Sequence, residues 1–319
     1  MDRKIAKALI SVTDKTGVVE FAKGLSDRGV AIIASGGTAA AIGKAGIEVT
    51  EISDMTGFPE CMDGRVKTLH PKVHGGILAD REKESHLEQA SALGIELIDI
   101  VVVNLYRFRE AAADPALDVK GKVEQIDIGG PTLIRSAAKN YHSVTVVVDP
   151  SDYPRVLEAI DSGKGKTDAD LRRTLASKAF HHTAVYDAAI SGFFDGLESP
   201  DGLPDEKIIV CRKSRSLRYG ENPHQKAALY LVDPPEGHFT DFTQHQGKEL
   251  SFNNIQDMWA AFLLGRDLGD GSCAILKHMN PCGAASGGTI LENFLRARKT
   301  DPLSAFGSVI SINGIVEEE

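Results

Sequence analysis

The sequence predicts an α/β protein in which a doubly wound parallel sheet is followed by a second domain. Four short runs rich in Val and Ile are each followed by polar residues or glycine, which is typical of buried parallel strands; these runs are residues 8–12, 30–34, 98–103 and 144–148. Helical spacing of apolar residues occurs between the runs. The chain of 319 residues also exceeds the roughly 250 residues at which a single core stops growing.

The segment between the first two strands predicts an amphipathic crossover helix. Its apolar residues recur with the spacing i, i+3, i+4 and i+7, at Val18, Phe21, Ala22 and Leu25. Asp14 or Thr16 is a suitable N-cap, and Gly29 is a suitable C-terminal stop. Residues 39–44 and 86–93 are further helical candidates. Repeated strand and helix units of this kind place ligands beyond the carboxyl ends of the strands.

Beyond residue 149 the pattern changes from alternating strands and helices to a helical extension. Residues 151–160 and 168–194 carry helical spacing, and residues 196–206 combine two prolines, two glycines and four acids, which is typical of a linker. An apparent strand at residues 308–312 belongs to the second domain. We therefore expect three parts: a core at residues 1–150, a helical extension and linker at 151–199, and a second domain at 200–319.

Composition and charge exclude several classes of function. The net charge of -9 and the pI near 5.6 disfavour nucleic acid as a partner. No apolar run is long enough to span a bilayer, and the N-terminus lacks the apolar stretch of a secretory signal, so we expect a cytoplasmic protein. The four cysteines lie far apart without metal-ligand spacing, so we expect no metal.

A glycine pair after the second strand is a candidate phosphate cradle. Ser35, Gly36, Gly37 and Thr38 directly follow residues 30–34 and open a helix. Backbone N–H groups at a helix N-terminus bind phosphate, but a plain tight turn would be about as consistent with this pattern alone. The neighbouring strand end favours the phosphate interpretation, because it supplies hydroxyls and an amine from Ser11, Thr13, Lys15 and Thr16.

A basic segment follows at residues 63–76. Five basic or imidazole side chains fall within ten positions, at Arg65, Lys67, His70, Lys72 and His74. We expect Pro71 and the pair Gly75 and Gly76 to prevent a helix here, which leaves an irregular loop. A solvated charged loop is one interpretation. In an acidic protein, a loop that binds and polarises an anionic ligand is the more plausible one.

The third candidate segment is residues 125–140. Pro131 suits the first position of a helix, which Gly129 and Gly130 would open. Asp127 precedes this helix and Lys139 lies on one of its faces, so the two could converge on a pocket and exchange a proton, or form a structural ion pair. Both interpretations stay open on the residues alone.

Two further polar residues follow the buried run 98–103 and should emerge at the same sheet edge. They are Asn104 and Tyr106. Tyr106 could donate a hydrogen bond to a developing oxyanion, or it could be a half-buried aromatic residue.

These segments together resemble a known family. The succession ISVTDKTG, ASGGT, GRVKTLHPKVHGG, NLYRF and QIDIGGPTLIRSAAKN closely resembles the IMP cyclohydrolase domain of the bifunctional purine-biosynthesis enzymes, whose fold is methylglyoxal-synthase-like. The resemblance implies a catalytic set of Lys67, Tyr106, Asp127 and Lys139. It also implies nucleotide contacts, chiefly to the 5'-phosphate, from Ser11, Lys15, Ser35, Gly36, Gly37, Thr38, Arg65, Thr68, Asn104 and Gly129.

The second half resembles the AICAR transformylase domain of the same family. The signatures are LRYGENPHQ, LSFNNIQD, LKHMNPCG and DPLSAFG, in family order. The resemblance implies a cytidine-deaminase-like α/β fold without metal, which agrees with Ala285 at the position where a zinc deaminase carries its second cysteine. It implies that Lys277 and His278 form a catalytic pair, and that nucleotide is contacted by Arg218, Tyr219, Asn254 and Gly307.

The resemblance implies a function in two steps. AICAR is formylated by 10-formyltetrahydrofolate as co-substrate, and formyl-AICAR then closes to IMP with loss of water and without a cofactor. The partners implied are these small purine nucleotides and a second copy of the chain in a homodimer. Family members continue for roughly two hundred residues past this chain, so we expect an N-terminal portion that retains only the cyclohydrolase step.

Two alternatives use the same fold. A regulatory nucleotide-binding module needs the phosphate cradle but has no use for Tyr106, Asp127 and Lys139 together. Methylglyoxal synthase is a single domain and leaves the chain after residue 200 unexplained.

Overall fold

The computed structural model describes residues 4–199, 201–232 and 242–316. The chain divides into two compact units, Met1–Ile208 and Ile209–Glu319. Each unit has its own sheet, and each is described by itself.

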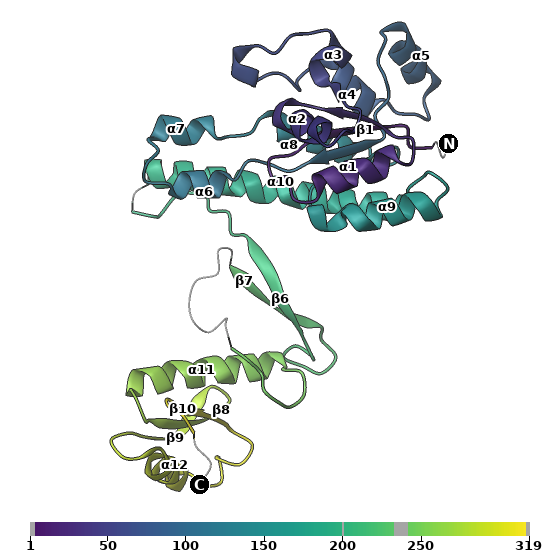
Figure 1. Cartoon of the computed structure of the whole chain (residues 1–319). Coiled ribbons are helices and arrows are strands. Elements are labelled where there is room, and N and C mark those ends of the chain that lie inside the picture. Colours follow the sequence, from purple (N-terminus) through teal and green to yellow (C-terminus); the bar gives the residue numbers. More distant parts are fainter. Residues whose placement is uncertain (1–3, 200, 233–241, 317–319) are drawn as a thin grey trace. The chain divides into compact units, whose positions relative to one another are not determined.

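The first unit is built on a five-stranded parallel sheet in the order β3-β2-β1-β4-β5 (Figure 1). The strands are β1 (Lys7–Ser11), β2 (Ala31–Ala34), β3 (Thr50–Glu51), β4 (Ile100–Val103) and β5 (Thr145–Val147). The predicted doubly wound parallel sheet is thus confirmed, with a short β3 in addition. The chain winds from β1 to β3 on one side and then returns to β4 on the other, so the strand order reverses between β1 and β4. Ligands of such sheets bind outside the carboxyl ends of the strands at that point.

Helices cover both faces of this sheet, since consecutive residues Ala8, Leu9 and Ile10 of β1 are all fully buried. The predicted crossover helix and the helical extension are confirmed. The helices are α1 (Val18–Ser26), α2 (Gly36–Lys44), α3 (Ile52–Thr56), α4 (Pro71–Leu78), α5 (Glu84–Ala92), α6 (Phe108–Ala113), α7 (Val119–Glu124), α8 (Gly129–Lys139), α9 (Tyr153–Ser162) and α10 (Ala169–Glu198).

The N-terminus of α1 differs from the prediction. Its N-cap is Gly17, at φ 64, and no side chain caps it. Asp14 instead accepts hydrogen bonds from the N–H and the hydroxyl of Thr16, at 2.9 and 2.6 Å. The expected capping carboxylate is therefore engaged in a local turn before the helix.

The expectation of an irregular loop at residues 71–76 is wrong, because α4 spans Pro71–Leu78. Pro71 is the first helical residue, where its missing N–H is not needed, and the Nδ1 atom of His70 accepts a hydrogen bond from Lys72 N–H at 3.1 Å. Gly76 allows close packing, since a Cβ there would lie 2.2 Å from the carbonyl oxygen of Glu96. The glycine serves a packing contact rather than a helix break.

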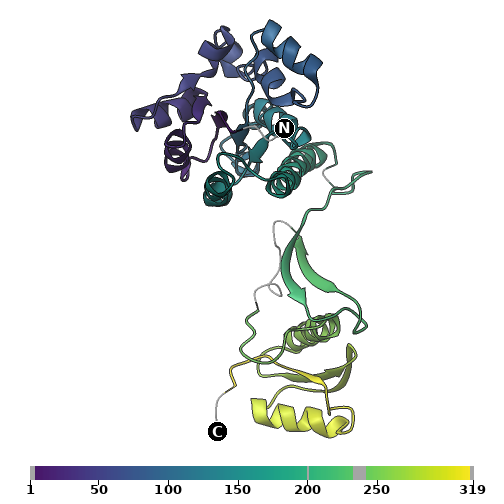
Figure 2. The same cartoon turned by 90° about the vertical axis from the view of Figure 1, so that its right-hand side faces the viewer.

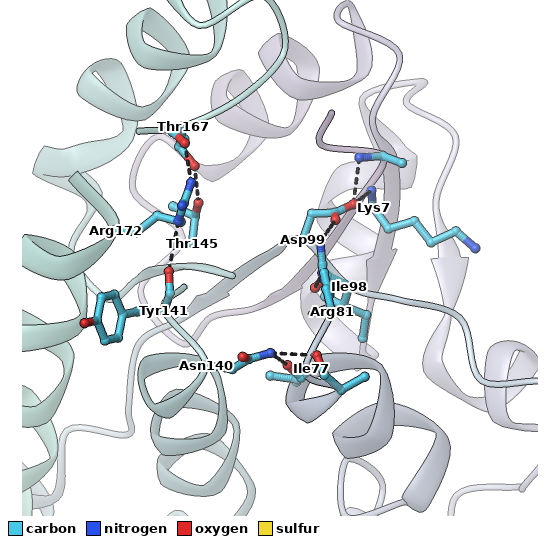
Figure 3. A network of polar contacts seen from close by, with 12 residues as sticks. Lys7, Ile77, Arg81, Ile98, Asp99, Asn140, Tyr141, Thr145, Thr167 and Arg172 are labelled. Atoms are coloured by element: carbon cyan, nitrogen blue, oxygen red, sulfur yellow. Dashed lines mark hydrogen bonds and ion pairs between the residues drawn. The ribbon is translucent and has the colours of Figure 1, made fainter. Parts of the chain in front are cut away.

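The amino ends of the strands are tied together by a buried ion pair (Figure 3). The Asp99 carboxylate accepts hydrogen bonds from Ala6 N–H at 2.7 Å, from Lys7 N–H at 2.9 Å and from Arg81 Nη1 at 2.6 Å. Arg81 also donates to the Ile98 carbonyl at 2.8 Å. These hydrogen bonds join β1 to β4 at the sheet edge opposite the predicted site, although the buried Arg81 Nε atom has no hydrogen-bond partner among the described residues.

The same edge is joined to the helices by a second set of contacts (Figure 3). The hydroxyls of Thr145 and Thr167 lie 2.7 Å apart. Arg172 of α10 donates to the Tyr141 carbonyl at 2.9 Å, and Asn140 donates to the Ile77 carbonyl at 2.7 Å. These contacts hold α8 and α10 near the amino ends of the strands. The carboxyl ends of the strands therefore remain available to a ligand.

The second unit contains a three-stranded antiparallel sheet in the order β10-β8-β9 and a separate hairpin, β6-β7. The elements are β6 (Cys211–Leu217), β7 (Ala227–Val232), α11 (Phe252–Leu268), β8 (Cys273–Lys277), β9 (Asn280–Ala285), α12 (Ile290–Thr300) and β10 (Val309–Ile312). Helices α11 and α12 lie on opposite sides of the three-stranded sheet (Figures 1 and 2). Accordingly, Cys273 and Ile275 of β8 pack with Ala297 of α12, whereas Ala274 and Leu276 pack with Ala261 of α11.

No helix in the described ranges is long and apolar enough to cross a membrane.

Candidate active site

A cavity of about 600 Å³ lies at the carboxyl edge of the first unit's sheet, where β1, β2 and β4 end and α8 begins. The structure brings twelve of the predicted residues to it: Ser11, Lys15, Ser35, Gly37, Thr38, Arg65, Lys67, Thr68, Asn104, Tyr106, Asp127 and Gly129. Gly36 lines an adjoining cavity of about 290 Å³, which also includes Ser35 and Lys67.

The N-terminus of α2 faces two lysine side chains. A Cβ at Gly36 would lie 3.3 Å from the Lys67 Nζ atom, and a Cβ at Gly37 would lie 3.8 Å from the Lys15 Nζ atom. Ser35 is the N-cap, but its side chain makes no capping hydrogen bond, and its hydroxyl lies 3.1 Å from that of Ser11. The first N–H groups of a helix have no partner within the helix. Together with two ammonium groups, they form a site suited to a phosphate.

Two of the predicted nucleotide contacts also hold the surrounding loops. The buried Thr38 hydroxyl accepts a hydrogen bond from Val12 N–H and donates one to the Val12 carbonyl, both at 3.1 Å. Its only hydrogen is therefore engaged. The Asn104 side chain accepts from the N–H groups of Thr13 and Asp14 at 2.7 and 3.0 Å, and donates to the Asp14 carbonyl at 2.9 Å. Asn104 thereby fixes the loop that carries Lys15.

Arg65 makes an ion pair across the cavity lining. Its Nε and Nη2 atoms donate to Glu124 Oε1 at 2.9 and 2.6 Å. The guanidinium lowers the pKa of the Glu124 carboxyl through this hydrogen bond. Both side chains are exposed. The carboxylate occupies the guanidinium edge that would otherwise bind an anionic ligand.

Asp127 is the half-buried carboxylate of the site. Burial raises the pKa of the Asp127 carboxyl, while the Gly130 N–H and the Lys67 ammonium oppose that rise. Its Oδ1 atom accepts from Gly130 N–H at 2.8 Å. Burial, and then the nearby Asp127 charge, raise the pKa of Tyr106. A carboxylate whose charge is disfavoured is a good acceptor for a substrate proton, and the protonated phenol beside it is a donor.

Helix α8 opens with two glycines because neighbouring side chains approach both positions too closely for a Cβ atom. A Cβ at Gly129 would lie 2.3 Å from the Thr68 Oγ1 atom, and a Cβ at Gly130 would lie 2.4 Å from Asp127 Oδ2. The helix also begins at Gly129 rather than at Pro131, two residues earlier than predicted. Thr68 and Asp127 can therefore both lie against the N-terminus of this helix.

The structure does not bring Lys139 to the cavity. Lys139 is exposed and is the last residue of α8, whereas Asp127 lies just before its first residue. At 1.5 Å per residue, the two ends of this helix are roughly 15 Å apart. The interpretation that Asp127 and Lys139 converge on one pocket is therefore not supported by this arrangement.

The sequence analysis missed four lining residues that flank Asp127. The cavity includes Val123, Glu124, Ile126 and Ile128. Val123 and Glu124 belong to α7, which was not predicted because its six residues contain a glycine and only two apolar side chains. The three apolar side chains give one wall of the cavity a surface that suits a flat, weakly polar ring.

In the second unit, Lys277 and His278 lie at the turn between β8 and β9. His278 and Met279 form the two-residue connection, and both have positive φ, at 53 and 65. Residues other than glycine and asparagine rarely adopt this conformation, and it occurs preferentially at functional sites. Lys277 Nζ donates to the Phe306 carbonyl at 3.1 Å, next to Gly307. The structure thus brings Lys277, His278 and the 306–307 turn together.

Of the other predicted contacts of the second unit, Arg218 and Tyr219 follow β6 and Asn254 lies on α11, whose Asp257 Oδ1 atom accepts a hydrogen bond from Met279 N–H of that turn at 2.7 Å. Arg218 and Asn254 line an open cavity of about 450 Å³. The Arg218 guanidinium stacks on the Tyr219 ring at 4.7 Å and donates to its hydroxyl at 3.1 Å. Asn254 Oδ1 accepts from the N–H and the hydroxyl of Ser251 in a capping box. Among the described residues, no three His, Cys, Asp or Glu side chains cluster as a metal site.

Comparisons with known proteins match the chain in two stretches. Residues 17–132 match the family described as the MGS-like domain. Residues 137–319 match the family described as the AICARFT/IMPCHase bienzyme.

Curated relatives match almost the whole chain. The bifunctional purine biosynthesis protein PurH of Magnetococcus marinus is 49% identical over 320 residues, which cover 98% of this chain and 60% of that protein. The protein of the same name from Bacillus cytotoxicus is 48% identical over 316 residues, which cover 98% of this chain and 61% of that protein. The chain therefore spans about three-fifths of the length of these relatives.

A solved structure titled "Crystal structure of ForH" is also similar. It has a TM-score of 0.55 and 39% sequence identity, and the match covers 60% of this chain and 99% of that chain.

Proposed function

This chain belongs to the AICARFT/IMPCHase bienzyme family, and on that premise we propose that its first unit closes the ring of formyl-AICAR to give IMP. The observation that carries the proposal is the cavity that combines a phosphate cradle with the half-buried Asp127 carboxylate and Tyr106. A module that only binds a nucleotide would need the phosphate cradle but neither Asp127 nor Tyr106.

The cradle supplies orientation. The nucleotide 5'-phosphate lies at the N-terminus of α2 between Lys15 and Lys67, and the base reaches towards the N-terminus of α8. The reaction joins two groups of one molecule, so holding them in attacking geometry can lower the barrier by several kcal/mol. Support comes from the positions of both ammonium groups beside the glycine pair.

The chemistry needs one proton acceptor and one oxyanion donor. The carboxamide nitrogen attacks the formyl carbon, and the carbon–nitrogen bond forms as the formyl double bond opens to an alkoxide. Asp127 takes the proton from the attacking nitrogen, while Lys67 and Tyr106 stabilise the alkoxide. That oxygen, once protonated, leaves as water with the hydrogen of the formamide nitrogen, and the aromatic ring is complete. No step is assigned to Lys139.

The family premise extends the proposal to the complete protein. There, AICAR receives a formyl group from 10-formyltetrahydrofolate in a second site. His278 removes the amine proton, and Lys277 assists electrostatically. We further propose that the complete protein is a cytoplasmic homodimer, and that the 319-residue chain catalyses the cyclohydrolase step alone.

A matched pair of lysine variants tests the assignment of the site. Lys67→Ala should lower IMP formation from formyl-AICAR at least about a hundredfold, since it removes both a phosphate contact and an oxyanion donor. Lys72→Ala, five residues away and outside the cavity lining, should retain wild-type turnover. Full turnover of Lys67→Ala would refute the proposed roles.

A further inference from the structure

The main chain of Asp127 is held by a side chain from a distant helix. The Asp127 N–H donates a hydrogen bond to the Tyr186 hydroxyl at 2.7 Å. Tyr186 lies on α10, 59 residues later in the sequence, and is 8% exposed. Because the Asp127 carboxylate separately accepts from Gly130 N–H, the residue is held at its backbone and at one carboxylate oxygen.

The Tyr186 ring is fixed by its own neighbours. It lies edge-on to Phe108 of α6, with ring centroids 6.4 Å apart. Phe108 is 1% exposed and in turn lies edge-on to Phe193, at 5.6 Å. This aromatic cluster leaves the Tyr186 ring little freedom, so the position of its hydroxyl is set by α10.

The hydroxyl remains protonated at neutral pH. Burial and the charges around it raise the pKa of Tyr186 to about 12. The oxygen that accepts from Asp127 N–H is therefore a neutral phenol, which adds no negative charge beside the carboxylate.

Helix α10 lies outside the part of the chain that resembles the general fold family. The MGS-like match ends at residue 132, and Tyr186 falls in the bienzyme match at 137–319. An MGS-like core of residues 17–132 contains Lys67, Tyr106 and Asp127 but lacks the group that holds the Asp127 main chain.

We infer that Tyr186 is a positioning residue for the ring closure, acting through Asp127 and not by contact with substrate. The inference rests on the proposed cyclohydrolase function and deepens it. With its N–H held by Tyr186 and its carboxylate held by the Gly130 N–H, Asp127 presents that carboxylate to the substrate nitrogen in one orientation. Small displacements of a catalytic group cost rate far more than binding.

The test compares two buried tyrosines in the 319-residue chain. Tyr186→Phe keeps the ring packing and removes the acceptor for Asp127 N–H. We expect kcat for IMP formation to fall about tenfold with KM for formyl-AICAR unchanged, because the phosphate cradle is untouched. The matched control is Tyr153→Phe, which removes another buried hydroxyl of the same unit and should leave kcat unchanged. Wild-type kcat in Tyr186→Phe would overturn the inference.

A double-mutant cycle separates positioning from general stabilisation of the fold. If Tyr186 acts through Asp127, Tyr186→Phe should cause little further loss of activity in an Asp127→Asn background. A loss of the same factor in both backgrounds would show that the hydroxyl acts independently of Asp127, and would overturn the inference.

Amide hydrogen exchange on the wild-type chain provides a test that requires no variant. The Asp127 amide should be protected from exchange although it precedes α8, because its hydrogen is bonded to Tyr186. Rapid exchange would contradict the inference even if Tyr186→Phe failed to fold. If the wild-type chain formed no IMP while the Asp127 amide was protected, the proposed function would fail and the contact would stand.

Discussion

At the scale of single residues, Asp127 combines a proposed catalytic task with a cost in stability. Burial raises the pKa of its carboxyl above the value of an unfolded chain. A carboxyl with a raised pKa in the folded state stabilises the fold when it is protonated, at low pH, and that contribution is lost as pH rises through the folded-state pKa. At neutral pH, Asp127 therefore carries its charge at the expense of folding stability.

Asp127→Asn should raise the melting temperature at neutral pH while abolishing most of the turnover. The amide oxygen can still accept from Gly130 N–H, and no charge is buried. The gain in melting temperature should shrink at a pH below the carboxyl pKa of the unfolded chain, where the wild-type carboxyl is also neutral. Calorimetric scans at both pH values check this, and a lower melting temperature than wild type at neutral pH would contradict it.

Glu124 offers a second prediction at the residue scale, because its carboxylate occupies the Arg65 edge that an anionic ligand needs. Glu124→Gln should tighten IMP binding by about threefold, since exposed ion pairs are weak competitors. The gain should diminish at high salt. Glu110→Gln, which removes an exposed partner of Arg107 outside the cavity lining, is the control for net charge. Titration calorimetry measures both, and weaker binding by Glu124→Gln would contradict the prediction.

At the scale of elements, the start of α8 depends on its glycines. Gly130→Ala would place a Cβ 2.4 Å from Asp127 Oδ2 and 2.7 Å from Leu105 Cδ2. We expect a loss of about 1–3 kcal/mol of unfolding free energy together with a fall in kcat, because the carboxylate must move. Gly192→Ala, inside α10 with nothing within 4 Å of the new Cβ, should instead stabilise by about 0.5–1 kcal/mol. Urea unfolding distinguishes the two, and equal effects would refute the packing argument.

The elements also show what sequence patterns can and cannot predict. Strands β1, β2, β4 and β5 were predicted because full burial in a parallel sheet requires continuous apolar runs. Helix α4 was not predicted, because its proline and its glycine pair look like helix breakers. The close contact of Gly76 with Glu96 explains why a glycine is found inside this helix. Local patterns record propensity, whereas contacts between distant segments decide such cases.

The residues of the candidate site also divide into those that local sequence patterns predicted and those that only contacts between distant segments bring together. The loops that end β1, β2 and β4 were predicted to meet because parallel strands share a carboxyl edge, and their residues do line one cavity. Glu124 and Tyr186 were not predicted. Each reaches the site from a helix whose sequence carries no motif, and only the packing of α7 and α10 brings them there. The convergence of Asp127 with Lys139 on one pocket was one of two interpretations that the residues left open, but the length of α8 separates the two residues.

At the scale of the whole molecule, the two compact units carry separate candidate sites. The cavity with its cradle, half-buried carboxylate and phenol is formed by residues of the first unit alone. In the second unit, Lys277 and His278 lie at one turn, whereas Arg218 and Asn254 line an open cavity. The chain covers about three-fifths of its curated relatives, so ring closure is the activity proposed for it.

The most direct test of that claim is a spectrophotometric assay of the 319-residue chain with two sets of substrates. In one reaction the chain receives formyl-AICAR, and in the other it receives AICAR with 10-formyltetrahydrofolate. We predict IMP from the first reaction and none from the second. A folded chain that binds IMP but forms none from formyl-AICAR would contradict the proposal, and would instead indicate a nucleotide-binding module without catalysis.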